Sequence, residues 1–155
     1  MTPTRRARRG LRGDTRTGTA ALPLLVLAAI GAASCGPPRA PELRQCSESY
    51  CYVITSDPIP PRAREDIIYT VTVKDRKSNQ PIETGEGRIF ANTREMARTY
   101  DGFVKAPQIG AYSARLNYVT SGQWAVGIQF HSDSTKPLEK TEWMQDVLPE
   151  RSGKP

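Results

Sequence analysis

Two runs of alternating side chains, at 112–118 and 124–130, constrain the fold of this chain more than any other feature of its sequence. In each run an apolar or aromatic residue occupies every second position. Successive side chains of a strand point to opposite faces of a sheet, so each run predicts a strand with one buried face. The short segment 120–122 predicts a turn that pairs the two strands as a hairpin. Because its apolar face needs a second layer, we expect an all-β, two-sheet sandwich.

Five further segments have strand character, at 50–55, 66–74, 87–91, 100–105 and 138–148. The segment 92–110 is long for a connection within a compact sandwich, and we expect 100–105 to form an edge strand inside it. The segment 138–148 fits either a helix or a strand. We favour the strand, because it would complete a sheet beside 124–130. The total is about seven strands.

Positive charge is concentrated at the N-terminus. The chain has a formal net charge of +6, and residues 1–34 contain six arginines but a single aspartate. The other 121 residues are nearly neutral, with 16 Lys and Arg against 15 Asp and Glu. A nucleic-acid-binding protein needs its positive charge on the folded domain, so we expect no nucleic-acid partner.

The basic segment is followed by a 14-residue apolar run at 20–33, which is too short to span a bilayer. This order predicts a secretory signal peptide. The small residues before Cys35 resemble the bacterial lipoprotein signal, in which the cysteine is lipidated and becomes the new N-terminus. The resemblance implies a membrane anchor, and Gly36 after the cysteine implies the outer membrane, facing the periplasm. The alternative is ordinary cleavage near Ala33, which leaves Cys35 as a free thiol.

These features divide the chain into four parts. Residues 1–34 are the expected lipoprotein signal peptide, and 35–45 are the lipidated N-terminus with a proline-rich tether. The sandwich domain is expected over 46–148, followed by a disordered tail at 149–155.

Two further cysteines, Cys46 and Cys51, enclose four residues. An exported domain reaches an oxidising compartment, where a local disulfide persists. A zinc site would need a second pair of Cys or His ligands, and a redox-active pair normally encloses two residues. We therefore predict a structural disulfide.

Several turn and core positions resemble those of extracytoplasmic immunoglobulin-like modules. Val73-x-Asp75 followed by Gln80-Pro81-Ile82 is similar to their opening hairpin. Gly110-x-Tyr112 and Gly122-x-Trp124 resemble the strand openings of FixH and YtkA-like domains. This resemblance spans about residues 66–130 and implies an immunoglobulin-like β-sandwich in the cell envelope. It also implies, as an alternative function, copper handling or cytochrome-oxidase assembly.

Metal chemistry would depend on Met96, His131 and Met144, the thioether and imidazole groups of the mature chain. Such ligands suit copper(I), provided that all three converge within bonding distance. Methionine in a small β domain more often fills gaps in the core, so we expect no cofactor.

No motif predicts an enzyme. His131, Ser132 and Asp133 are adjacent, and adjacent side chains at a strand end cannot form a catalytic relay by themselves. Trp143 lies in the segment of uncertain type and is the candidate for an exposed binding anchor. The sequence thus predicts a lipid-anchored, non-catalytic binding or accessory module with a protein partner in the envelope.

Overall fold

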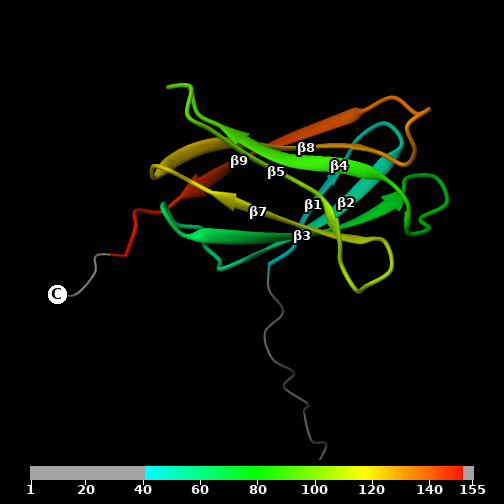
Figure 1. The fold of residues 1–155 in the computed structure, drawn as a ribbon, viewed down its shortest axis with the longest axis horizontal. Helices are drawn as coiled ribbons and strands as arrows, with labels where there is room; N and C mark the ends of the chain where they lie inside the picture. The colour runs from blue at the N-terminus through cyan, green and yellow to red at the C-terminus, as the bar shows by residue number, and fades with distance from the viewer. Residues whose placement is uncertain (1–40, 152–155) are drawn as a thin grey trace, which may run out of the picture. The chain divides into compact units, whose positions relative to one another are not determined.

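The computed structural model describes residues 41–151 of the chain. This part contains nine strands. Figure 1 shows how they are arranged. They are β1 (Leu43–Cys46), β2 (Tyr50–Asp57), β3 (Asp66–Asp75), β4 (Glu86–Asn92), β5 (Arg98–Gly102), β6 (Val104–Lys105), β7 (Ala111–Asn117), β8 (Gly122–His131) and β9 (Glu139–Val147). No helix within residues 41–151 is long and apolar enough to cross a membrane. The predicted signal peptide and Cys35 lie outside the described residues.

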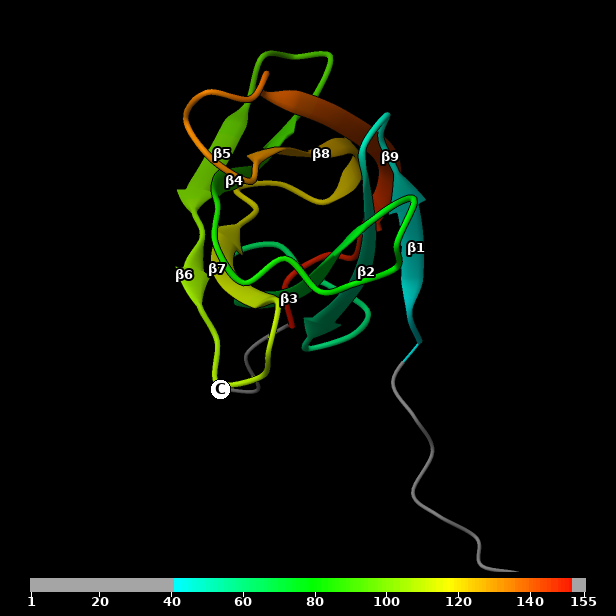
Figure 2. The same cartoon turned by 90° about the vertical axis from the view of Figure 1, so that its right-hand side faces the viewer.

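The strands form two antiparallel sheets that face each other (Figure 2), with the orders β1-β2-β3-β7-β6 and β5-β4-β8-β9. In an immunoglobulin constant-type domain, strands A, B, E and D form one sheet and C, F and G form the other. Strands β2, β3, β7 and β6 correspond to A, B, E and D, while β4, β8 and β9 correspond to C, F and G. Strand β5 adds an edge beside β4. The prediction of an all-β, immunoglobulin-like sandwich is confirmed.

Every second residue of the long strands packs into the core between the sheets. Trp124 on β8 is fully buried, and its ring meets Tyr118 edge-on with centroids 5.1 Å apart. Its indole N–H donates to the carbonyl of Thr120 at 3.0 Å. The hydroxyls of Tyr69 and Tyr118 are hydrogen-bonded at 2.6 Å. Burial raises the pKa of Tyr69 to about 12, although this hydrogen bond lowers it, so the pair is neutral at physiological pH.

The predicted hairpin of 112–118 and 124–130 is wrong, although both segments are strands. β7 belongs to one sheet and β8 to the other. The two strands place their apolar residues in the same core from opposite sides. Alternation shows which face of a strand is buried, but a hairpin and a crossing between sheets bury the same residues. The expected reversal from Val73 to Ile82 is present, with an antiparallel bridge between Lys74 and Pro81, but the chain then crosses to the other sheet, so β4 does not pair with β3.

Two differences at edges raise the strand count from seven to nine. The predicted edge strand at 100–105 is divided at Phe103 into β5 and β6, which belong to different sheets. Strand β1 occupies 43–46, so the folded domain begins inside the predicted tether. At the other end, the predicted disorder is wrong for residues 149–151. Glu150 lies 3.3 Å from Arg64, and Arg151 lies 3.3 Å from Glu65.

Candidate functional site

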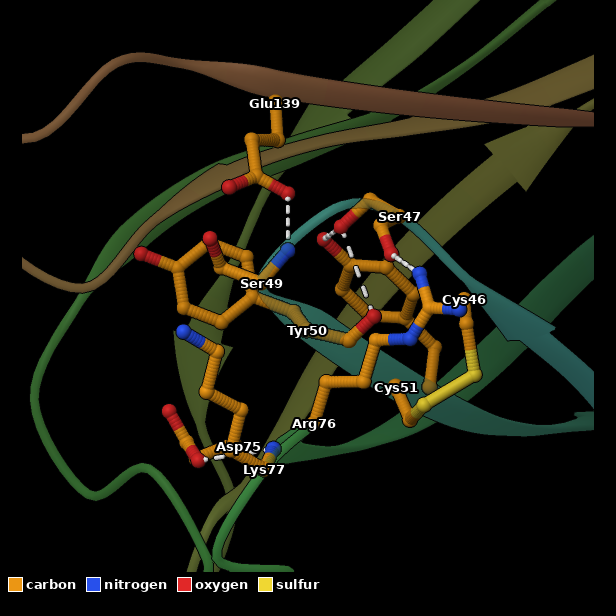
Figure 3. The surroundings of a disulfide bond; sticks show 10 residues. Cys46, Ser47, Ser49, Tyr50, Cys51, Asp75, Arg76, Lys77 and Glu139 are labelled. Atoms are coloured by element: carbon orange, nitrogen blue, oxygen red, sulfur yellow. Dashed lines mark hydrogen bonds between the residues drawn. A yellow bond between two sulfur atoms is a disulfide. The ribbon is translucent and has the colours of Figure 1, made fainter.

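The predicted disulfide is present at the turn between β1 and β2. Cys46 and Cys51 are direct partners in the ladder of these strands, with their Cα atoms 4.1 Å apart. Figure 3 shows how the turn is fastened on two further sides. Arg76, after β3, donates to the carbonyl of Ser47 at 2.7 Å, and the backbone N–H of Ser49 donates to Glu139 at 2.9 Å. Since these contacts join the turn to β3 and β9, the bridge acts as a structural staple.

The three candidate metal ligands do not converge. Met144 on β9 pairs with Ala125, whereas His131 lies six residues further along β8. At about 3.4 Å per residue, these positions are about 20 Å apart. Met96 lies in the turn after β4, near the Ala125 end. A copper(I) ion needs all its ligands in direct contact, so Met96, His131 and Met144 cannot form one site. Within the described residues, no cluster of three or more His, Cys, Asp or Glu could hold a metal ion.

The residues at the end of β8 also lack a catalytic arrangement. The Nδ1 atom of His131 lies 2.7 Å from the backbone carbonyl of Asp133. The hydroxyl of Ser132 accepts a hydrogen bond from Tyr50 at 3.0 Å. The imidazole therefore bonds to the backbone of this turn, while the serine is bonded to a tyrosine on β2.

The structure overturns the prediction that Trp143 is an exposed anchor. Its segment is a strand, as favoured, but Trp143 points inward and is only 9% exposed. Within the described residues its indole N–H has no acceptor. Alternation along β9 places Glu142, Met144 and Asp146 on the opposite, solvent-exposed face. Binding residues therefore have to be sought on that face.

The surface of the β5-β4-β8-β9 sheet that points away from the core, called the outer face here, is the strongest candidate. Phe90 on β4 and Tyr100 on β5 are direct cross-strand partners on it, and Tyr100 is 69% exposed. A Cβ atom at Gly127 would lie 2.5 Å from the Phe90 ring, so glycine is needed for the ring to lie over β8. Lys140 on β9 sits 5.2 Å from the centre of the same ring, a cation–π contact.

A hollow of about 400 Å³ opens on this face beside Phe90 and Tyr100. Arg88, Arg98 and Met96 also line it, together with backbone and polar atoms of both strands. Arg88 donates to Gln129 at 2.7 Å. Within residues 41–151 neither Arg88 nor Arg98 has a carboxylate within ion-pair distance, and no acidic side chain lines the hollow. The hollow therefore combines aromatic surface with positive charge and suits an anionic group attached to an apolar one.

The turn between β4 and β5 holds Met96 in an unfavourable conformation. Its φ angle is 68°, in the left-handed region that glycine and asparagine tolerate best. The N–H of Met96 donates to the carbonyl of Thr93 at 3.2 Å, which closes the turn. Its side chain is 73% exposed, so it gains little from the core. Strained backbone at an exposed apolar residue supports a functional role for this turn.

Sequence analysis singled out Met96 and Met144 only as candidate metal ligands, and it missed Phe90, Tyr100, Arg88 and Arg98. Alternation within 86–92 places Arg88 and Phe90 on the same side of the strand. An aromatic residue in a short strand is ordinarily assigned to the core, so Phe90 was not considered as a surface residue beside Arg88.

No protein-family model matches the chain, and no curated protein matches it. Among solved structures, it is similar to a DUF4426 family protein from Pseudomonas aeruginosa PAO1. The TM-score is 0.54 at 11% sequence identity, over 71% of this chain and 97% of that one. At this identity the similarity concerns the fold alone.

Proposed function

We propose that this chain is a cell-envelope lipoprotein whose immunoglobulin-like domain is a non-catalytic binding or accessory module that acts through its outer face. The observation that carries the binding role is the hollow beside Phe90 and Tyr100, whose two arginines have no carboxylate partner among residues 41–151. Tyrosine, methionine and arginine are enriched at protein interfaces, and tyrosine and arginine at their energetic centres. These residue types meet on a sheet surface that is ordinarily polar when it only faces water.

The proposed location depends on the N-terminal segment. A basic region, a short apolar run and small residues before Cys35 support export and lipid anchoring. Gly36 supports the outer membrane, with the domain facing the periplasm. The resemblance to FixH and YtkA-like domains supports an accessory role in the envelope, and we propose a protein partner there.

Site-specific photo-crosslinking of the full chain in its own membranes tests this role. The photoreactive amino acid p-benzoylphenylalanine replaces Tyr100 in one variant and Ile68 in the control. Ile68 is 42% exposed on β3, in the other sheet, so it samples the opposite surface of the domain. We expect a discrete crosslinked product from position 100 that is absent from position 68.

Introducing Arg98→Ala into the Tyr100 crosslinking variant should reduce that product several-fold, because an interfacial arginine at a hot spot contributes at least 2 kcal/mol. Equal crosslinking from the two positions, or a product unaffected by Arg98→Ala, would contradict binding through the outer face.

A further inference from the structure

The outer face carries opposite charges at its two sides. Arg88 and Arg98 lie on β4 and β5, whereas Glu142 and Asp146 lie on β9, and all four residues are exposed. Met144 lies between the two acidic residues and is 58% exposed. From residue 142 to 146, beyond the exposed Lys140, strand β9 therefore presents an acidic, apolar, acidic series on the same surface that has a basic and aromatic hollow. The acidic and apolar residues of β9 are therefore complementary to the basic and aromatic hollow of the same chain.

The strand register arranges the centre of this face in three rows of four residues. In the order β5, β4, β8, β9, the rows are Arg98, Asn92, Ala125, Met144; then Tyr100, Phe90, Gly127, Glu142; then Gly102, Arg88, Gln129, Lys140. The first row ends in a cation at β5 and a thioether at β9. The second row ends in a phenol and a carboxylate.

We propose that two copies of this chain associate face to face through their outer faces, with β9 of each copy over β5 of the other. The two-fold symmetry axis would lie between β4 and β8, parallel to the strands, so that each row of one copy lies over the same row of the other in reverse order. Such an isologous contact is typical of homodimers. The proposal rests on the proposed function, because it names the partner of the same surface.

This arrangement places complementary groups opposite each other. Arg98 lies over Met144 of the second copy, between its Glu142 and Asp146. The hydroxyl of Tyr100 faces Glu142, and a phenol can donate to a carboxylate. Within one copy Glu142 lies 2.9 Å from Lys140, but both side chains are nearly half exposed. Exposed ion pairs contribute little to stability, so Glu142 is free to exchange partners.

No two like charges lie directly opposite each other in this arrangement. Lys140 faces Gly102, where a Cβ atom would find open space, so its side chain is accommodated. Arg88 faces Gln129 of the second copy, which can accept its hydrogen bond in the same way as Gln129 of its own copy. Like charges directly apposed would cost several kcal/mol, and none of the directly opposed pairs in the three rows has them. The third row does bring Arg88 of one copy within about one strand spacing, about 4.8 Å, of Arg88 and Lys140 of the other, so the attraction has to come from the first two rows.

The size of the face predicts a weak, reversible dimer. Four strands about 4.8 Å apart and six residues of about 3.4 Å each give a face of about 19 by 20 Å. Stable interfaces bury about 800 Å² per partner, which is well above this projected area. We therefore expect association in the micromolar range, where concentration on a membrane surface would promote it.

Exchanging the charges of Arg98 and Glu142 tests the proposal. The full exported chain is extracted in mild detergent, and sedimentation velocity over a concentration series measures its dimer dissociation constant. Arg98→Glu alone and Glu142→Arg alone should each raise the dimer dissociation constant at least tenfold, because each places like charges in contact. An equimolar mixture of the two variants should restore association to within about threefold of the wild type, because both contacts become attractive again. Lys77→Glu and Glu48→Arg, at the disulfide end, are matched controls that should leave association unchanged.

The photo-crosslink at position 100 separates failure of this inference from failure of the proposed function. A product of twice the mass of the processed, lipidated chain supports the dimer. A product with another protein, together with a monomeric wild type, overturns the dimer and leaves the binding role intact. Absence of any product contradicts both. Failure of the variant mixture to restore association also overturns the pairing, even where the wild type dimerises.

Discussion

At the residue scale, Met96 has a backbone conformation that costs stability and an exposed side chain that does not offset the cost. A left-handed backbone costs an ordinary residue about 1 kcal/mol or more, and asparagine tolerates it better. The exposed thioether offsets none of this cost through core packing. The side chain lies at the hollow of the outer face, where it can contact a partner. Contact with a partner is the role that we propose for this side chain.

Met96→Asn should therefore raise the free energy of unfolding by about 0.5–1 kcal/mol while weakening binding through the outer face. Chemical denaturation and crosslinking from position 100 measure the two effects. Met144→Asn is the control, because it removes a second exposed methionine from a residue with ordinary strand geometry. It should weaken binding without any gain in stability. A stabilised Met96→Asn variant with undiminished binding would remove the functional explanation for the strain.

Glu139 makes the stability of the fold depend on pH in the acidic range. Partial burial raises its pKa, but hydrogen bonds from Ser47 and Ser49 lower it by more, so the pKa lies below the ordinary value of 4.5. A depressed pKa in the folded state means that the ionised carboxylate stabilises the fold above the unfolded-state pKa. This contribution is lost as pH falls through the folded-state pKa.

Glu139→Gln keeps an acceptor for the Ser49 N–H but removes the charge. At pH 7 it should lower the free energy of unfolding by less than about 1 kcal/mol, because solvent screens a half-buried carboxylate. The difference from the wild type should shrink as pH falls through the lowered folded-state pKa. Thermal unfolding from pH 7 to pH 3 measures it, with Glu142→Gln as an exposed control. A difference that persists unchanged at pH 3 would show that the charge is not responsible.

At the element scale, the sequence predicted which segments are strands better than how the strands connect. Trp124, Val126 and Ile128 were assigned to the buried face correctly, because alternation reports burial directly. The partner of each strand could not be predicted in the same way. β7 and β8 bury the same residues whether they pair or cross between sheets. Strand β9 was assigned beside β8 correctly, but its alternation left open which of its faces was buried, so Trp143 was misplaced.

The candidate site was harder to predict than the fold, because it is formed by partners across strands. Phe90 and Tyr100 are ten residues apart in sequence and meet only through the register of β4 with β5. Arg98 and Met144 occupy the same row through three successive strand pairings. No local spacing contains this information. The disulfide could be predicted, since its two cysteines are close in sequence and a hairpin turn brings them together.

The staple at Cys46 and Cys51 should contribute moderately to stability. Closing so short a loop removes about 2 kcal/mol of chain entropy from the unfolded state. Replacing both residues, Cys46→Ser with Cys51→Ser, should lower the free energy of unfolding by about this amount. The domain should still fold, because Arg76 and Glu139 hold the same turn. Urea denaturation measures the loss. An unchanged midpoint, or two free thiols in the exported wild-type protein, would contradict the structural role.

At the scale of the whole molecule, anchoring and folding should be separable. Cys35 lies outside the described residues, and the segment 36–42 is rich in proline, which favours an extended spacer. The core is built from strands after residue 42, and none of its contacts requires a lipid. The proposed lipid anchor would let the domain meet a second copy by diffusion in the same membrane, at an effective concentration that suits a weak contact.

Cys35→Ser should release the chain from the membrane without unfolding the sandwich. A lipid chain contributes about 0.8 kcal/mol per buried CH₂ group to membrane binding, and serine cannot be lipidated through a thioether. Detergent partitioning of cell fractions measures retention. Near-ultraviolet circular dichroism of the soluble protein reports on the packing of buried Trp124 and should match that of the extracted wild type. A serine variant that stays in the membrane fraction would show that another segment provides the anchor, whereas a released but unfolded variant would show that anchoring and folding are coupled.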